Sequence, residues 1–557
     1  MNSTIYRFIN SNKDILAAIS IFVSTVLILG IFFTHWGFQH DDFGVIWHIR
    51  TASDNLLKLF IEPGMTCVYQ PSNFHMPEQS FFAVLYRPFS CIFYALQYKM
   101  FGFSAYGYFL TTIILHALNA ILFFFLLRRF VPLTAAYLAT LFFAFHISFW
   151  DWIGWISGQE HIINCTLILI IIHLVKYHLD SKKILPLLGA LAVFLISLFT
   201  RETAIFFPFW LPCAVYLYRH HGVRQAVMLQ DCIRIAFSFL TVSIVYLGIR
   251  LFFYPLKTQG QGIKIILNPI AFIVNLKHRF FDAVTFLSDI ANLSWLGGGH
   301  RFLKGSFIIL FIAICFTLFL HNKNKKLFLF FVLSGFLFMW PALLRYYSSR
   351  YLYKVLPFFI MGGLCLITNA RSQRANYSTL LARIAAYIMV VVIIINTSLL
   401  TLHMKQREQT LHQTEIALKE LVLNQQNNPE KLCFVALPND PFITGVAQAL
   451  RMFGYDTSKP IYYDQTTFVS FLRQPDKNPI ALTKNGNQLH LISLDPNNVW
   501  FCDKNIFTNM GTITVNKYND RGNPVDMDMT LDAQWIEQPL RFVTWDYQAH
   551  RFVMLDF

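Results

Sequence analysis

Long apolar runs recur along this chain, and they limit what it can fold into more than any other feature. The runs 15–33, 106–127 and 380–402 each come close to the roughly 20 residues that cross a bilayer as a helix. Charged residues make up only 13% of the 557 residues, against about 25% in soluble domains. A soluble globule is therefore excluded, and the sequence predicts a protein that crosses a membrane several times.

Clusters of Lys and Arg between the apolar runs predict how the chain is oriented. We expect about eleven spans within residues 1–403, which together form a mainly α membrane bundle. Their approximate limits are 15–35, 106–127, 132–149, 161–178, 184–200, 203–218, 233–254, 305–320, 326–343, 352–369 and 380–402. If the N-terminus is cytoplasmic, every predicted inner turn is basic, as the positive-inside rule requires. The first outer loop is then 36–105, the second outer loop is 255–304, and the tail 404–557 also lies outside. The basic residues of the inner turns are Arg128, Arg129, Lys176, Lys182, Lys183, Arg219, Arg224, Lys323, Lys325, Lys326, Arg371 and Arg374.

The first apolar run is expected to remain attached as an uncleaved anchor. It follows the polar segment MNSTIYRFINSNKD and is longer than the apolar region of a signal peptide. No small-x-small cleavage site follows it.

The positive charge belongs to the membrane part of the chain. The tail 404–557 contains 14 Lys and Arg against 17 Asp and Glu, whereas residues 1–403 contain 31 against 13. These basic residues are scattered over short loops rather than gathered on one face with aromatic residues, which argues against a nucleic-acid binder. Cys91 and most other cysteines lie in or beside apolar stretches, where we expect them to act as small hydrophobic residues.

The outer segments are predicted to be structured. The stretch 88–102 is amphipathic, and 268–292 mixes apolar with charged residues, which is typical of helices that lie in the membrane interface. The tail begins with a predicted helix at 404–427 and continues with strand-like runs such as KLCFVAL and QLHLISL between turn signals. We expect a small extracytoplasmic domain of the α/β or α+β class.

Two adjacent acids, Asp41 and Asp42, follow the first span directly. Desolvation of a carboxylate at the membrane surface is unfavourable, so such residues are either solvated or take part in function. The pair is therefore a candidate functional site. One of them would act as a general base on an acceptor hydroxyl, or the pair would bind a divalent ion. The alternative is a solvated loop that merely begins with two acids. The neighbouring His35, His40 and His48 fit no standard metal-binding spacing.

The region around the first acids and the next span resembles the GT-C superfamily of polytopic glycosyltransferases. The similarity is carried by the acidic pair and by YRPFSCIFYALQYKMFGFSAYGYFLTTIILHALNAILFFFLLRRF (86–130), with YRP and LHALNAILFFFLLRR as its most specific parts. It is strongest to the branch of protein O-mannosyltransferases and bacterial aminoarabinose-type transferases. The similarity extends weakly to about residue 370, and the tail has no assignable motif.

The resemblance implies a sugar donor carried on polyprenyl phosphate and a general base at Asp41 or Asp42. It also implies substrate contacts at the Arg201–Glu202 pair, for which a salt bridge between helix ends is the alternative. In the polar turn SGQEHIIN, Gln159 stands where relatives place Arg, and Glu160 remains a candidate second acid.

Basic residues on the predicted outer side fit a phosphate-bearing substrate independently of the resemblance, because the planar guanidinium of Arg donates two hydrogen bonds at once. The alternative is interfacial anchoring by Tyr together with snorkelling Arg side chains. The residues concerned are Arg87, Arg201, Arg345, Arg350 and Lys354, with Tyr346 beside them.

The sequence therefore predicts a membrane glycosyltransferase that inverts the anomeric configuration in one displacement. The donor is a polyprenyl-phosphate sugar, and the acceptor is a lipid, a glycan or a protein. A glycan ligase or polymerase shares the many spans and outer arginines, and a non-catalytic assembly protein is a further alternative. A transporter is less consistent with polar residues that gather on one side. The resemblance favours a bacterial inner membrane, with the tail in the periplasm. The sugar, the acceptor and any need for a divalent metal ion stay open.

Overall fold

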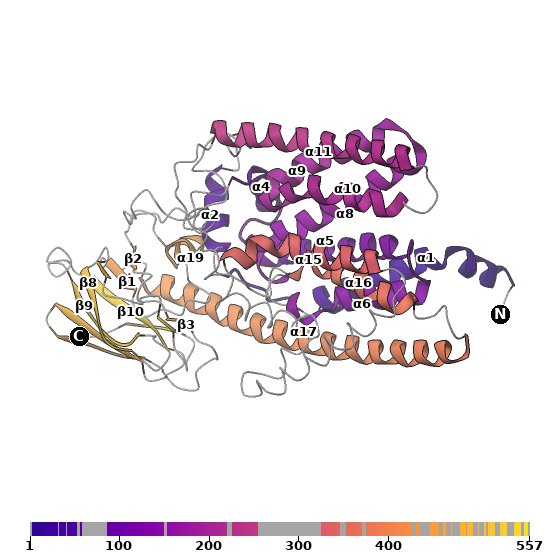
Figure 1. The fold of residues 1–557 in the computed structure, drawn as a ribbon. Coiled ribbons are helices and arrows are strands. Elements are labelled where there is room, and N and C mark those ends of the chain that lie inside the picture. Colours follow the sequence, from indigo (N-terminus) through magenta and orange to yellow (C-terminus); the bar gives the residue numbers. More distant parts are fainter. Residues whose placement is uncertain are drawn as a thin grey trace.

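A computed structural model describes much of the membrane part and shorter pieces of the tail. Figure 1 shows a bundle of helices, with the strands of the tail gathered at one end and the N-terminus at the other. The described residues are 3–31, 33–39, 42–52, 56–57, 59, 86–149, 153–219, 225–253, 325–345, 352–369, 375–425, 431–434, 446–455, 461–463, 469–470, 480–485, 487–493, 499–500, 506–507, 511–518, 524–531, 540–546 and 551–554.

The bundle consists of apolar helices that follow one another with short connections. Each predicted span that falls on described residues coincides with a helix, whereas the predicted span 305–320 and the predicted interfacial stretch 268–292 lie outside the described residues. The helices are α1 (Ser3–Val26), α5 (Ala105–Leu127), α6 (Leu133–Ala144), α8 (Gln159–Ser181), α9 (Ile184–Thr200), α10 (Phe207–Arg219), α11 (Gln225–Phe253), α15 (Lys325–Arg345), α16 (Leu356–Asn369) and α17 (Ala375–Gln425).

Within the described part of the chain, five helical stretches are long and apolar enough to cross a membrane. They are Asn12–Gly30, Ala105–Leu127, Ile156–Ser181, Leu229–Phe253 and Ala386–Gln425. Shorter apolar helices lie at Leu133–Ala144, Ile184–Thr200, Glu202–Leu217 and Leu356–Cys365. The protein is therefore mainly helical, with helices suited to a bilayer.

The last helix, α17, continues well beyond its apolar half. It has 51 residues, about 76 Å at 1.5 Å per residue. Its sequence contains neither Gly nor Pro, so nothing in it interrupts the backbone hydrogen bonds. The predicted span 380–402 and the predicted tail helix are thus parts of one continuous helix.

Two shorter helices belong to the first predicted outer loop. Helix α2 (Asp42–Ala52) follows the acidic pair, and α4 (Pro88–Phe101) matches the predicted amphipathic stretch 88–102. The structure corrects one expectation on α4, because Cys91 is disulfide-bonded rather than a plain small hydrophobic residue. Disulfides persist in oxidising compartments such as the periplasm.

The tail contains β-strands, as the turn-separated apolar runs predicted. A four-stranded mixed sheet has the order β11-β10-β1-β2, with β1 parallel to both of its neighbours, and an antiparallel sheet has the order β4-β5-β9-β8-β7. A third pair joins β3 to β6. The elements are β1 (Lys431–Phe434), α19 (Val446–Met452), β2 (Ile461–Tyr463), β3 (Val469–Ser470), β4 (Ile480–Asn485), β5 (Gln488–Ser493), β6 (Val499–Trp500), β7 (Ile506–Phe507), β8 (Gly511–Tyr518), β9 (Pro524–Leu531), β10 (Leu540–Asp546) and β11 (Arg551–Met554).

The tail and the first predicted outer loop share a hydrophobic core. Phe43 and Ile46 of α2 belong to the same buried cluster as Leu418 of α17, Phe434 of β1 and Leu450 of α19. A separate and larger cluster fills the helix bundle. The shared core fixes α2 against the C-terminal half of α17.

Candidate functional site

Arg87, the N-cap residue of α4, is the first residue of the candidate site along the chain. Pro88 occupies the first helical position, where its fixed φ suits a helix and its missing N–H costs nothing. The guanidinium of Arg87 contacts two carboxylates: its Nη1 donates to Glu160 Oε1 at 2.5 Å, and its Nη2 donates to Glu202 Oε2 at 3.0 Å. Only 13% of the Arg87 side chain is exposed, so these charge-assisted bonds are largely shielded from water.

The partners of Arg87 lie at the ends of other helices. Glu160 is in the first turn of α8, and Arg201 caps the C-terminal end of α9. Each charge is favourable there, because a helix carries partial positive charge at its N-terminus and partial negative charge at its C-terminus. Arg201 Nη1 also donates to Glu160 Oε1. Glu160 therefore accepts from two arginines at once.

A buried lysine completes the cluster. Lys354 lies in the turn before α16, is 4% exposed, and donates from Nζ to Thr203 Oγ1 at 2.8 Å. Its neighbours in the electrostatic environment are Arg201, Arg87, Glu160 and Glu202. Three basic and two acidic side chains therefore meet between the ends of α4, α8, α9 and α16.

The protonation of this cluster follows from its burial and its pairs. Burial and then the charges of Arg201 and Arg87 hold the pKa of Lys354 well below its ordinary value. Burial opposes the charge of Glu202 as well, but Arg87 outweighs it and lowers the pKa of the Glu202 carboxyl. Likewise, Glu160 and Glu202 overcome the burial of Arg87 and raise its pKa. The cluster therefore holds three ion pairs beside an amine that loses its proton more easily than an ordinary lysine does.

Asp42 has a different environment from the cluster. It is fully buried as the first residue of α2, and its carboxylate accepts backbone N–H groups from Ser157 at 2.7 Å, Gln39 at 3.1 Å and Ile156 at 3.4 Å. Both carboxylate oxygens are used in these bonds. Asp42 thereby joins the segment that follows the first span to the turn that precedes α8.

Tyr94 of α4 connects Asp42 to the cluster. Its hydroxyl donates to the carbonyl of Ser157 at 2.9 Å. Burial, followed by the charges of Glu160 and Asp42, raises the pKa of Tyr94, so the phenol lies close to both acids. Asp42 and the cluster around Glu160 therefore belong to one connected assembly.

Gln159 also has a structural explanation. Its side-chain amide donates to Thr112 Oγ1 at 2.6 Å and to the Tyr108 carbonyl at 2.9 Å, and it accepts from Gln97 Nε2 at 2.8 Å. All of these partners are neutral. An arginine at this position would bring a buried charge into a neutral hydrogen-bond network, which is costly.

The segment 33–39 is held in place from two sides. From the bundle, the Gly154 carbonyl accepts from Trp36 Nε1 at 2.8 Å and from Gln39 Nε2 at 2.7 Å. A Cβ atom at Gly154 would lie only 2.0 Å from Trp36 Cζ2. Glycine at this position therefore allows the indole to approach the backbone.

Helix α17 holds the same segment from the other side. Glu408 Oε1 accepts the backbone N–H of His35 at 2.8 Å, and Arg407 Nε donates to Gln39 Oε1 at 2.6 Å. Glu408 is 2% exposed. The C-terminal half of α17 thus anchors the segment 33–39, which precedes the two adjacent acids in the sequence.

Five of the residues named from the sequence meet in one cluster in the structure: Arg87, Glu160, Arg201, Glu202 and Lys354. Asp41, Tyr346 and Arg350 lie outside the described residues, as does the side chain of Arg345 at the end of α15. The described residues contain no group of three or more His, Cys, Asp or Glu arranged to hold a metal ion. His40 and the side chain of His48 are not described.

Arg250 is the cation that sequence reasoning missed. It lies in the last turn of α11, inside a predicted span, and its charge helps to lower the pKa of Glu202. The available signal was a basic residue within four positions of the end of an apolar run on the predicted outer side.

Comparisons with known proteins give a fold-level similarity only. No family model matches the chain, and no curated protein matches it. ArnT from Cupriavidus metallidurans bound to undecaprenyl phosphate is 12% identical with a TM-score of 0.40, over 80% of this chain and 85% of that one, and its apo state gives the same values. The Archaeoglobus fulgidus oligosaccharyltransferase in complex with Zn and sulfate is 14% identical with a TM-score of 0.41, over 74% of this chain and 56% of that one.

Proposed function

We propose that this chain is a membrane glycosyltransferase of the GT-C type, which transfers a sugar from a polyprenyl-phosphate donor to an acceptor hydroxyl at the outer face of the membrane. The observation that carries the proposal is the convergence of Arg87, Arg201 and Lys354 at one end of the bundle. Glu160 and Glu202 balance the charges of the two arginines. An anionic phosphate group that enters the cluster is therefore balanced by protonation of the Lys354 amine, and it accepts charge-assisted hydrogen bonds from these basic side chains.

In the proposed reaction, Arg87, Arg201 and Lys354 bind the donor phosphate. An acceptor hydroxyl gives its proton to a carboxylate, and its oxygen attacks the anomeric carbon. The bond between that carbon and the phosphate oxygen breaks, and the electron pair leaves with polyprenyl phosphate. Negative charge therefore grows on the phosphate in the transition state, where preorganised cations stabilise it most. A single displacement of this kind inverts the anomeric configuration.

We assign the general base to Asp41 and a positioning role to Asp42. Both oxygens of the Asp42 carboxylate already accept backbone N–H groups, which leaves that residue poorly placed to take a proton from an acceptor. Asp41 is the adjacent acid, and it stands in the sequence between two residues that the structure holds in place, Gln39 and Asp42. Arg345, Arg350 and Tyr346 stay in the proposal as further contacts of the donor.

The orientation in the proposal is N-terminus inside and tail outside, in a bacterial inner membrane. It is supported by the disulfide at Cys91 on the helix that carries Arg87, because disulfides require an oxidising compartment. The basic turns that contain Arg129, Lys182 and Lys326 lie at the opposite ends of their helices, in agreement with the positive-inside rule.

The test is mass spectrometry of cell-envelope glycans, lipids and glycoproteins from cells that lack the protein, complemented with wild type or single variants at matched abundance. We expect wild type to restore one defined sugar and Asp41→Asn to restore none, while remaining as abundant and as stable as wild type. Asp42→Asn is expected to lower protein stability together with transfer, because its amide cannot accept from three N–H groups as a carboxylate does.

Two results would refute the assignment. If the deletion strain has the same glycans, lipids and glycoproteins as wild type, the proposed activity is refuted. If Asp41→Asn restores the sugar fully, Asp41 is not the general base. Retention of anomeric configuration in the product would exclude the single displacement.

A further inference from the structure

A second candidate site lies far from the ion-pair cluster. Helices α8, α10, α15 and α16 enclose a cavity of about 640 Å³, within the range of roughly 300–1,000 Å³ that is typical of small-molecule sites. Lys176, on its edge, is sixteen residues along α8 from Glu160, a separation of about 24 Å along the helix axis. The cavity is therefore distinct from the proposed catalytic site.

The walls of the cavity are mainly apolar. Trp210, Phe330, Phe331, Phe358 and Met361 contribute aromatic and thioether surface. The indole N–H of Trp210 already donates to Ser334 Oγ at 2.6 Å, so this side chain offers the cavity an apolar face. Such a wall suits a hydrocarbon chain and offers little to a polar ligand.

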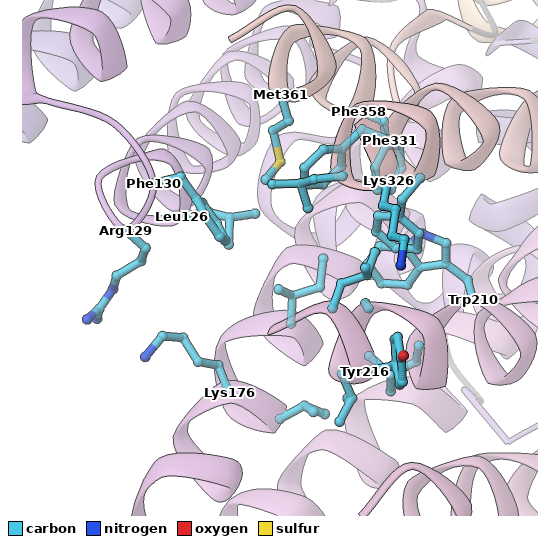
Figure 2. A pocket seen from close by; sticks show the side chains of 18 of the residues that line it. Leu126, Arg129, Phe130, Lys176, Trp210, Tyr216, Lys326, Phe331, Phe358 and Met361 are labelled. Atoms are coloured by element: carbon cyan, nitrogen blue, oxygen red, sulfur yellow. The ribbon is translucent and has the colours of Figure 1, made fainter. Parts of the chain in front are cut away.

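The edge of the cavity is basic. Arg129, Lys176, Lys325 and Lys326 all line it, and Figure 2 shows Arg129 and Lys176 on one side with Lys326 across from them. Lys176 is paired with Asp180 at 2.5 Å. Arg129 and Lys326 have no carboxylate partner among the described residues, and both are exposed.

We propose that this cavity binds an anionic phospholipid of the bilayer, with an acyl chain against Trp210 and Phe358 and the phosphate between Arg129 and Lys326. The combination of an apolar interior and a basic edge matches the two parts of such a lipid. A zwitterionic phospholipid offers the same chain but no net charge. The site lies in the leaflet opposite to the ion-pair cluster and is independent of the proposed catalytic function.

The test is native mass spectrometry of the purified full-length protein in detergent, titrated with phosphatidylglycerol or with phosphatidylcholine of identical chains. We expect one tightly retained phosphatidylglycerol and much weaker phosphatidylcholine. Arg129→Gln combined with Lys326→Gln is expected to weaken the binding of phosphatidylglycerol roughly 10- to 30-fold. Each cation near an anionic headgroup contributes about a 5-fold gain in affinity, and the double variant lacks both. Equal binding of the two lipids would overturn the proposal.

A matched control separates local from general charge effects. Lys13 and Arg234 are exposed and lie outside the cavity lining, so Lys13→Gln combined with Arg234→Gln removes the same charge elsewhere. We expect this variant to bind phosphatidylglycerol as wild type does. An equal loss in both double variants would show a general charge effect and refute the site. Stronger retention of a polyprenyl phosphate than of phosphatidylglycerol would also refute it, because it names a different occupant.

Two further experiments test whether the lipid chain enters the cavity: a bulky side chain that fills it, and a quencher on the acyl chain. Ala214 lines the cavity, and Ala214→Trp is expected to abolish the tight lipid while leaving the basic edge unchanged. In parallel, phosphatidylglycerol brominated on its acyl chain should quench tryptophan fluorescence less in Trp210→Phe than in wild type. Equal quenching in the two proteins would place the chain outside the cavity and overturn the proposal, whether or not Ala214→Trp folds.

Discussion

At the scale of single residues, Glu160 is the centre of the ion-pair cluster. Its Oε1 accepts from both Arg87 and Arg201, and its side chain is 11% exposed. A buried pair is not in itself strong evidence for stability, because desolvation offsets the attraction, but removal of one partner leaves the other charge buried and uncompensated. Removal of this carboxylate therefore takes an ion-pair partner from both arginines, and Arg87 retains only its pair with Glu202.

Glu160→Gln is expected to reduce the free energy of unfolding by about 3–5 kcal/mol, as is typical when a buried ion pair is broken. The measurement is a denaturant titration of the purified protein in mixed micelles. Glu415→Gln is the matched control, since Glu415 pairs with Lys419 at 2.6 Å on an exposed face of α17, and such pairs contribute only about 0.3–0.5 kcal/mol. Equal losses in the two variants would contradict a special role for Glu160.

Lys354 makes anion binding by the cluster depend on pH. Its pKa is held low first by burial and then by Arg201 and Arg87, against the opposing charges of Glu160 and Glu202. An anion that enters the cluster favours the protonated amine, so binding must weaken as the pH rises through the lowered pKa. The two arginines keep their charge throughout the neutral and alkaline range.

Sulfate tests this dependence, because it stays fully ionised over the whole range in which the protein is stable. We expect the rise in melting temperature that sulfate produces to decrease as the pH is increased in steps, and this decrease to vanish in Lys354→Met. The same pH dependence in wild type and Lys354→Met would show that another group is responsible.

The residues of the candidate site could be named from the sequence, with the exception of Arg250, but their pairing could not. Arg201 and Glu202 are adjacent in the chain, and a salt bridge between helix ends was the expected alternative to a substrate contact. Arg201 at the end of α9 and Glu160 in the first turn of α8 form such a bridge. In the structure Arg201 pairs with Glu160 and Glu202 pairs with Arg87. These partners lie 41 and 115 residues away, so only the packing of α4, α8 and α9 determines them.

At the scale of elements, α17 shows where composition misleads. The change from apolar to polar residues near 403 suggested a boundary between a span and a tail helix, although no Gly or Pro interrupts the sequence. The apolar runs located the helices well because helix length in a bilayer is set by the thickness of the hydrocarbon core. The continuity of α17 depends on local helix propensity, which the change in polarity concealed.

The continuous α17 predicts an effect on catalysis at a distance. Glu408 holds the backbone of His35, six residues before Asp41. Glu408→Ala is expected to lower the rate of sugar transfer by roughly 10- to 100-fold, because misplacement of a catalytic group by about 1 Å has effects of this size. The donor KM should change little, since the cluster around Arg87 is untouched.

A transfer assay with membranes containing matched amounts of protein measures this effect. Glu420→Ala serves as the control on the same helix, because its exposed position lies away from the segment 33–39. Loss of transfer that is explained entirely by loss of folded protein would contradict a positioning role for Glu408.

At the scale of the whole molecule, the ion-pair cluster and the basic turns lie at opposite ends of the helix bundle. One end has the ion-pair cluster, the disulfide at Cys91 and the strands of the tail, which share a core with α2. The other end has the basic turns and the lipid-binding cavity. This separation follows from the alternation of long helices with short turns, since each helix of about 20 residues carries the chain from one surface to the other.

The orientation of these two ends is tested by two engineered cysteines with similar exposure. The side chain of Lys182, which caps the C-terminal end of α8, is 57% exposed, and that of Lys419, in the C-terminal half of α17, is 55% exposed. In intact cells whose outer barrier has been opened, a membrane-impermeant maleimide should label Lys419→Cys at once and Lys182→Cys only after the inner membrane is permeabilised. Because the two side chains are equally accessible in the folded protein, a difference between them reports the membrane and not local burial. The reverse order of labelling would place the ion-pair cluster in the cytoplasm, and sugar transfer at the outer face would then be impossible.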